Sequence, residues 1–248
     1  MTQADTLSPI ALMRQLGTAQ APVIIDVCID EDVQADPFLI PTAQRWDHFN
    51  ISALPSDIKK KNLVIACQKG RKLSQGAAAL LRAEGVRAQV LDGGVMAWRA
   101  AGLPRVPLDL LPGPGAPDLW VTAQGPSRDA LACAWLIRRF ISRRATCLFV
   151  PRSDIAEVAT RFTALPFADG DSPGFAAMLR RYGLETPALQ RMARALGPDA
   201  PETSGLNAVF AGLQCGEQDD HARSDAALTL CDALYLWACA DETDQVAA

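Results

Sequence analysis

The chain has 248 residues, of which 49% are hydrophobic and 21% charged, and its formal net charge at pH 7 is −4. This length is sufficient for two modest domains, each with its own core. The negative charge argues against a large nucleic-acid-binding surface. No stretch approaches the roughly 18 uninterrupted apolar residues of a membrane helix, and the N-terminus lacks a basic secretory signal. We therefore expect a cytoplasmic protein without a membrane partner.

The seven cysteines are scattered along the chain, without close pairs at the spacing of a metal-binding motif. Together with the absent secretory signal, this indicates free thiols in a reducing compartment rather than a disulfide framework. We expect neither a bound metal nor an organic cofactor.

In the first part of the chain, short apolar runs at 22–27, 63–66 and 88–91 are typical of buried strands. Between the last two, residues 73–84 carry alanine and leucine at helical spacing and end at Gly85, a residue that favours helix termination. This strand–helix–strand unit predicts a parallel sheet with helices on its faces.

Residues 104–117 read PRVPLDLLPGPGAP, and their prolines disfavour both helix and regular strand pairing. We therefore predict a first domain at 1–104, a linker at 105–117 and a second domain at 118–248. In the second domain, 119–122 and 147–150 resemble strands, and 128–141 forms a helix with one apolar stripe. The rest beyond Ser153 is predicted to be helical, so this domain is mostly α with a small sheet.

Cys67 follows a predicted buried strand and precedes a predicted helix. The intervening residues can form a tight turn whose amides point inward, and such a nest next to a helix N-terminus favours a negative charge. Positive charge in this turn should further increase the thiolate fraction of the cysteine. A buried cysteine at a strand end, followed by a solvated basic turn, is the structural alternative. The candidate loop residues are Gln68, Lys69, Gly70, Arg71, Lys72 and Leu73.

The strand, Cys67, the short basic loop and the following helix resemble the active-site loop of rhodanese-like domains. The run LDGGVMAWRAAGLP at 91–104 is similar to the closing signature of that family, L-x-G-G-x-x-x-W-x-x-x-G-x-P. Upstream, Asp26-Val27 and the run IPTA at 40–43 resemble two earlier family motifs. The resemblance covers roughly residues 8–104.

This resemblance implies a sulfurtransferase that works by double displacement. The Cys67 thiolate would take the outer sulfur of a small donor such as thiosulfate, and a thiol or cyanide acceptor would then remove it. The amides of residues 68–73 would stabilise the persulfide, and the three cationic side chains would attract an anionic donor. Leu73 occupies the position where cysteine phosphatases carry an arginine, so phosphatase activity is a poor alternative.

The domain departs from the family pattern at two places. Cys28 replaces the arginine that usually follows Asp-Val, and Asp36-Pro37-Phe38-Leu39 replaces a Gly-His motif. Cys28 could resolve a persulfide, although a small core or surface residue is the favoured interpretation. His48 is a lone histidine in a polar connection and is interpreted as a surface residue. None of these departures removes the nucleophile.

The second domain resembles the C-terminal domain of the chromate-resistance family. The resemblance is carried by the run LWVT at 119–122, by RDALACAWLIRRFI at 128–141 and by CLFVP at 147–151. Asp219-Asp220-His221 and Tyr235-Leu236-Trp237 are also similar to that family. Two segments depart from it: 166–173 lacks the usual histidine and cysteine, and Gly197-Pro198-Asp199-Ala200-Pro201 replaces an acidic segment.

Arg138 and Arg139 could bind an oxyanion such as chromate, but neighbouring helix residues point about 100° apart, so a solvated helix end is the favoured interpretation. His221 could ligate a metal, although a histidine without a second strong ligand more often begins a helix. Cys133, Cys231 and Cys239 are expected in the core.

We therefore carry three hypotheses. The leading one is a Cys67 sulfurtransferase whose second domain selects an acceptor or partner. The second is a chromate- or oxyanion-responsive binding or regulatory protein, and the third is a scaffold with a catalytically silent first domain. The second domain could also act as a dimerising module, and a homodimer is compatible with the sequence.

Overall fold

The computed structural model describes residues 5–113, 116–168, 170, 174–216 and 219–246, with side chains described up to residue 240. The chain divides into two compact units, residues 1–111 and 112–248, and each is described by itself. Residues 114–115 of the predicted linker, and 169 and 171–173 of the segment after Pro166-Phe167, lie outside the described residues. Within the described range, no helix is both long and apolar enough to span a membrane.

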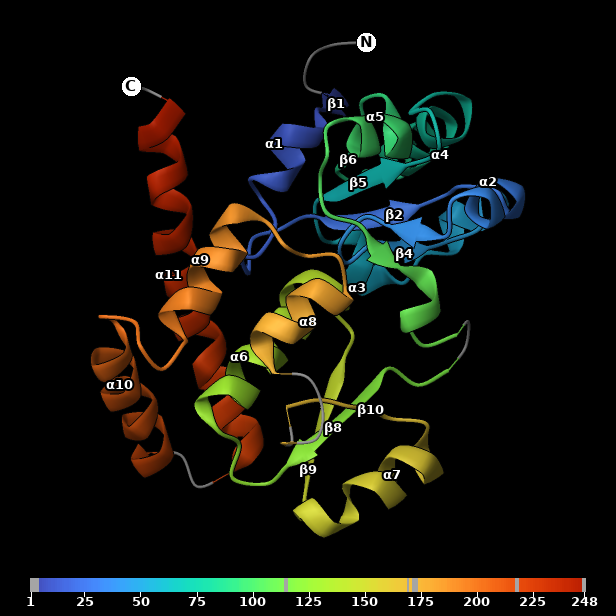
Figure 1. The fold of residues 1–248 in the computed structure, drawn as a ribbon. Coiled ribbons are helices and arrows are strands. Elements are labelled where there is room, and N and C mark those ends of the chain that lie inside the picture. The colour runs from blue at the N-terminus through green and yellow to red at the C-terminus, as the bar shows by residue number, and fades with distance from the viewer. Residues whose placement is uncertain (1–4, 114–115, 169, 171–173, 217–218, 247–248) are drawn as a thin grey trace. The chain divides into compact units, whose positions relative to one another are not determined.

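The first unit contains a five-stranded sheet in the order β1-β6-β5-β2-β4 (Figure 1), and every neighbouring pair is parallel. This confirms the expected α/β class. The two apolar runs at 63–66 and 88–91 form β5 and β6 with the predicted bounds. The strands are β1 (Thr6–Leu7), β2 (Val23–Asp26), β4 (Gln44–Arg45), β5 (Leu63–Ala66) and β6 (Ala88–Leu91).

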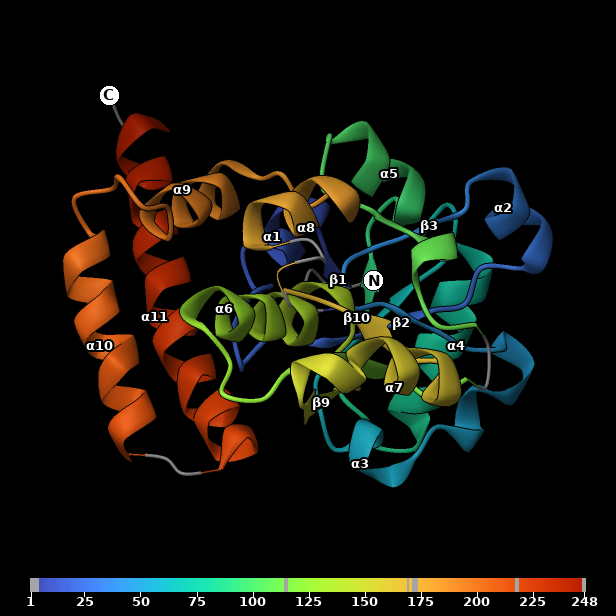
Figure 2. The ribbon, with the colours of Figure 1, turned by 60° about the horizontal axis from the view of Figure 1, so that its bottom comes forward.

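Helices cover the sheet on both sides, and Figure 2 shows α1 and α4 on opposite sides. Apolar residues of α4 and η2 pack with those of β2 and β5 in one buried cluster. The predicted helix at 73–84 is α4, which ends before Gly85, a glycine with φ +79°. The helices are α1 (Pro9–Met13), α2 (Asp30–Ala35), η2 (His48–Ala53), α3 (Ser56–Lys59), α4 (Lys72–Ala83) and α5 (Gly94–Ala100).

The beginning of the proline-rich stretch is part of the first unit. β7 (Val106–Pro107) pairs antiparallel with β3 (Phe38–Leu39), and the 3-10 turn η3 (Leu108–Leu110) follows it. Pro107 can occupy this short two-stranded sheet because an edge position does not require its missing N–H. This pairing shortens the connection between the units relative to the linker predicted at 105–117.

The second unit contains a three-stranded parallel sheet in the order β10-β8-β9. Helix α7 packs on one face, where Val121 and Ile155 belong to a common apolar cluster. The mostly helical class with a small sheet is confirmed. The elements are β8 (Leu119–Ala123), α6 (Arg128–Leu136), η4 (Ile137–Ile141), β9 (Thr146–Val150), η5 (Arg152–Asp154), α7 (Ile155–Phe162), β10 (Leu165–Pro166), α8 (Phe175–Arg181), α9 (Pro187–Ala195), α10 (Thr203–Gly216) and α11 (Asp220–Val246).

Helix α6 is the centre of the second unit. We expected one apolar stripe on this helix, but every residue from 130 to 137 is buried. The buried surface is therefore wider than a single face of the helix. The helix contacts both α8 and α11, and a helix enclosed by neighbours becomes apolar all round. Its last turn, η4, is a π-helix, and Phe140 packs edge-on to Trp135 at a centroid distance of 5.6 Å.

A charged network joins α6 to α11. The Asp232 carboxylate accepts hydrogen bonds from Arg139 at 2.8 and 2.9 Å and from the indole N–H of Trp135 at 2.7 Å. Only 15% of the Arg139 side chain and 17% of the Asp232 side chain are exposed. Because both charges are largely withdrawn from water, removing one partner should leave the other without compensation.

We expect Asp232→Asn to lower the free energy of unfolding by roughly 3 kcal/mol, because Arg139 loses its buried counter-ion. Asp225→Asn is the matched control, since Asp225 pairs with Arg138 but is 65% exposed and should contribute less than about 1 kcal/mol. Urea unfolding of the full chain, followed by circular dichroism, measures both. Equal effects of the two substitutions would contradict the importance of burial.

Candidate functional site

Cys67 lies directly after β5 and is 5% exposed. Its Sγ lies 3.1 Å from Oγ of Ser74, which is fully buried in the first turn of α4. Ser74 Oγ is also 3.2 Å from the carbonyl oxygen of Arg71. The sulfur therefore sits between the end of a central strand and the start of a helix.

The Ser74 hydroxyl has one proton and two possible acceptors. Beside a neutral Cys67 thiol, it can accept the S–H proton and donate its own proton to the Arg71 carbonyl. Beside a thiolate, the sulfur can only accept, so Ser74 must turn its proton toward it. A hydrogen bond to a charged acceptor is stronger than one to a neutral carbonyl, which makes Ser74 a stabiliser of the thiolate.

The loop rests on the beginning of α5. The amide of Val95 donates to the Cys67 carbonyl and that of Met96 to the Gln68 carbonyl, both at 3.0 Å. The approach is close because Gly70 and Gly94, with φ of +63° and +62°, have no side chains. A Cβ on Gly94 would lie 2.1 Å from the Cys67 carbonyl oxygen. Backbone contact with the cysteine loop thus explains the second glycine of the GG pair in the 91–104 motif, Gly94.

The amides of residues 68–74 have no protein acceptor in the part of the chain that the structure describes. Three of them belong to the first turn of α4, where helix geometry leaves N–H groups unsatisfied. Lys69, Arg71 and Lys72 are exposed, and none forms an ion pair with a described residue. Amides and cations without a described partner, all within the loop that follows Cys67, make the loop suited to an anion.

Gln68 connects the loop to α2. Its side-chain amide donates to the Asp32 carboxylate at 2.6 Å, and both residues are partly buried. The sequence analysis missed Asp32, which lies 36 positions away from Gln68. The acidic run at 30–32 could have drawn attention to Asp32, but no sequence pattern indicates that this residue contacts the Cys67 loop.

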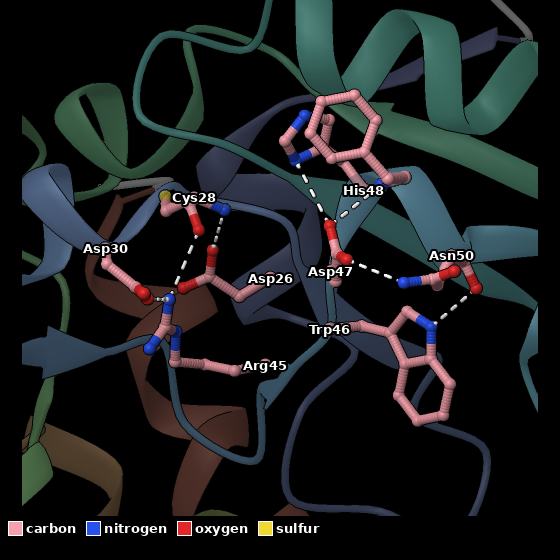
Figure 3. A network of polar contacts seen from close by, with 9 residues as sticks. Asp26, Cys28, Asp30, Arg45, Trp46, Asp47, His48 and Asn50 are labelled. Carbon is pink, nitrogen blue, oxygen red and sulfur yellow. Dashed lines mark hydrogen bonds and ion pairs between the residues drawn. The ribbon is translucent and has the colours of Figure 1, made fainter.

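Asp26 lies at the end of β2 and accepts a hydrogen bond from the amide of Cys28 at 2.8 Å (Figure 3). Arg45 stands across the pair β2–β4 and donates to the Cys28 carbonyl at 3.3 Å and to Asp30 at 2.7 Å. Burial raises the pKa of Asp26, and the positive charge of Arg45 opposes this increase. Arg45 thus places a cation near Asp26, although the arginine expected at position 28 is absent.

Cys28 packs in the same apolar cluster as Cys67. Burial, and then the neighbouring Asp26, raise the pKa of the Cys28 thiol, so it stays protonated near neutral pH. This favours the core interpretation of Cys28 over a resolving thiol. His48 stacks on Phe49 at 4.0 Å and lies 3.7 Å from the Asp47 carboxylate (Figure 3).

Comparison with known families assigns both units. Residues 11–101 match the sequence model of the rhodanese-like domain, and residues 120–238 match that of the ChrB C-terminal domain. The chain joins a rhodanese-like domain to a ChrB C-terminal domain. The protein ChrB of Cupriavidus metallidurans is 33% identical over 129 residues, which are 47% of this chain and 39% of ChrB. The aligned region thus spans well under half the length of that relative.

Solved structures resemble the rhodanese-like domain. A rhodanese-related protein from Thermoplasma volcanium is 18% identical, covers 41% of this chain and 96% of its own, and has a TM-score of 0.35. A thiosulfate sulfurtransferase from Pseudomonas aeruginosa is 27% identical, covers 42% of this chain and 19% of its own, and has a TM-score of 0.34.

The two candidate arginines of the ChrB C-terminal domain are both paired. Arg138 contacts Asp225 at 2.6 Å, and Arg139 pairs with Asp232. The interpretation of these residues as a solvated helix end is therefore wrong for Arg139. An oxyanion would have to displace these carboxylates. His221 lies in the first turn of α11, and its ring meets Phe149 edge-on at 5.1 Å.

We considered His221 as a possible metal ligand. Among the described residues, no group of three or more His, Cys, Asp or Glu side chains could hold a metal ion. Cys133 and Cys231 are buried, as expected, whereas Cys239 is half-buried. The described side chains therefore offer no ready metal centre in the ChrB C-terminal domain.

We expect Gly94→Ala to destabilise the rhodanese-like domain by roughly 2–4 kcal/mol, because the new methyl group overlaps the Cys67 carbonyl and strains a positive φ. Gly76→Ala in α4 is the control. Nothing lies within 4 Å of its Cβ, and alanine should stabilise the helix by about 0.5–1 kcal/mol. Urea midpoints measure both, and a neutral Gly94→Ala would contradict the close approach.

Asp26→Asn should gain stability relative to the wild type as pH rises above the usual aspartate range. The raised pKa of Asp26 means that its stabilising contribution is present below the usual aspartate range and is lost as pH increases. Asparagine cannot ionise, yet its side-chain oxygen can still accept the hydrogen bond from the Cys28 amide. Urea midpoints at several pH values measure the difference, and a difference that does not change with pH would contradict the prediction.

Proposed function

We propose that the rhodanese-like domain transfers sulfane sulfur through a persulfide on Cys67. The observation that carries the proposal is the loop itself. A buried sulfur contacts a hydroxyl able to donate to its thiolate. The loop that follows it carries amides without an acceptor, and three cations without an ion-pair partner, among the residues that the structure describes. The match to the rhodanese-like family and the structure of the loop support the same chemistry.

The first step would begin with the Cys67 thiolate attacking the outer sulfur of thiosulfate or of a small persulfide. A new S–S bond forms on Cys67 while the donor's own S–S bond breaks, and with thiosulfate the bonding electron pair leaves on sulfite. In the second step, an acceptor thiolate or cyanide attacks the outer sulfur. Cys67 then leaves as the thiolate, so the enzyme is regenerated without a net redox change.

Electrostatics favours an anionic donor. Lys69, Arg71 and Lys72 surround the loop without ion-pair partners among the described residues, so their potential is available to a substrate. The amides of the loop can receive the negative outer sulfur once the cations have attracted the donor. Because these amides are fixed by the docking on α5, they need little reorganisation during the reaction.

Intact-mass measurement after incubation with thiosulfate tests the proposal. The wild type should gain the mass of one sulfur atom, dithiothreitol should reverse the gain, and Cys67→Ser should show none. Cys215→Ser, which removes an exposed thiol from α10, is the matched control and should retain the adduct. Ser74→Ala should form it roughly ten times more slowly, because the thiolate loses its hydrogen bond.

Two outcomes would contradict the proposal. An adduct of equal size on Cys67→Ser would assign the sulfur to another thiol. Complete absence of an adduct on the wild type, while Cys67 still reacts readily with an alkylating agent, would leave a reactive thiol without the proposed donor chemistry.

A second candidate function rests on the match of residues 120–238 to the ChrB C-terminal domain. In this hypothesis the protein binds chromate or a related oxyanion and acts as a regulatory protein. We expect saturable heat in a calorimetric titration with chromate, and Cys67→Ser should retain it because the site belongs to the other domain. Absence of heat at millimolar chromate would discard this candidate.

A further inference from the structure

The first turn of α2 carries three carboxylates, and one of them contacts the loop of the candidate nucleophile. Asp30 pairs with Arg45 at 2.7 Å, as Figure 3 shows, so its charge is compensated. Asp32 instead accepts a hydrogen bond of 2.6 Å from the side-chain amide of Gln68, the residue that directly follows Cys67. The proposed sulfur transfer gives this carboxylate no role.

The hydrogen bond fixes the position of the Asp32 carboxylate but does not neutralise it. Gln68 contributes a neutral amide, and no cation pairs with Asp32 among the residues that the structure describes. Both side chains are partly buried, and water and salt screen such a charge less than an exposed one. A fixed negative charge therefore lies beside the residue next to Cys67.

The field of this carboxylate extends to other groups around the candidate nucleophile. Burial is the main reason why the pKa values of Asp26 and of the Cys28 thiol are raised, and the charge of Asp32 contributes to both increases. Cys28 packs in the same apolar cluster as Cys67. Asp32 thus influences this part of the domain through its charge as well as through its contact with the loop.

The loop itself is cationic, and its cations act against Asp32. Lys69, Arg71 and Lys72 attract an anion, but their side chains are exposed and therefore screened. Coulomb energy is proportional to the charge of the ligand, so the cations alone would favour a dianion over a monoanion. The Asp32 carboxylate opposes this preference, and its repulsion of a dianion is twice its repulsion of a monoanion.

We infer that Asp32 is a specificity-determining residue, whose charge disfavours dianionic thiosulfate and thereby favours a small persulfide with an ammonium group as the sulfur donor. In this transfer the S–S bond of the donor breaks, an S–S bond forms on Cys67, and the donor leaves as a thiolate. The identity of the donor rests on the persulfide chemistry proposed for Cys67. The effect of the Asp32 charge on Cys67 does not.

Two alkylating agents of different charge measure this effect on Cys67 in the full chain. Iodoacetamide is neutral, iodoacetate carries one negative charge, and both react with the same thiolate, so the ratio of their rate constants reports the local potential. We expect Asp32→Asn to raise the iodoacetate-to-iodoacetamide ratio about threefold at low ionic strength, because asparagine keeps the acceptor for Gln68 but loses the charge. Peptide mass spectrometry follows the modification of Cys67 alone. An unchanged ratio would overturn the inference.

Glu31→Gln is the matched control, because it changes the net charge of the domain by the same amount. Glu31 precedes Asp32 in α2, is exposed, and has no hydrogen-bond or ion-pair partner among the described residues. Its substitution should change the ratio by less than about 1.5-fold, since water screens an exposed charge. Equal changes in the two variants would assign the effect to net charge and overturn the inference.

Two sulfur donors test the consequence for the substrate. We expect Asp32→Asn to form the Cys67 persulfide about tenfold faster with thiosulfate but at most about threefold faster with cysteine persulfide, because doubling the ligand charge squares the effect on the rate. Equal acceleration with both donors would overturn the inference. If the wild type forms no persulfide with either donor, the proposed sulfur transfer fails, and the alkylation ratio still decides whether the charge of Asp32 acts on Cys67.

Discussion

The geometry around Cys67 depends on two backbone hydrogen bonds that join its loop to the beginning of α5. The carbonyls of Cys67 and Gln68 accept from the amides of Val95 and Met96, and in doing so they fix the direction of the chain between β5 and α4. Glycines at positions 70 and 94 permit this contact, because a side chain at either would overlap backbone atoms. The loop amides remain free to face a ligand because the carbonyls, not the amides, make the docking contacts.

The neighbours of Cys67 are consistent with the nucleophilic role that we propose for this buried cysteine. Burial alone disfavours a thiolate, as the protonated Cys28 in the same apolar cluster illustrates. Cys67 differs from Cys28 in its neighbours: Ser74 Oγ lies 3.1 Å from its sulfur, a helix begins beside it, and unpaired cations follow in the sequence. Cys28 instead lies beside the Asp26 carboxylate, which repels a second negative charge. The two thiols, which follow neighbouring strands, thus lie in different polar surroundings.

The ChrB C-terminal domain uses its charges in two ways. Where a carboxylate is withdrawn from water it is fully paired, as Asp232 is by Arg139 and Trp135, and this network joins α6 to α11. By contrast, Arg194, Asp199 and Glu202 near the end of α9 have no ion-pair partner among the described residues, because water can solvate these partly or fully exposed charges. The first arrangement holds helices together, and the second contributes little to their packing.

The sequence by itself determined much of the local structure and the position of the candidate cysteine. The apolar runs at 63–66 and 88–91, the helix ending at Gly85 and the loop after Cys67 all follow from short-range patterns of side chains. Tertiary structure alone decided which distant groups meet, such as Asp32 with Gln68 and Arg45 with the Cys28 carbonyl. It also decided that Arg139 is paired with Asp232 rather than solvated. Periodicity reports which face of an element is apolar, but the partner of a polar side chain depends on the packing of elements far apart in the chain.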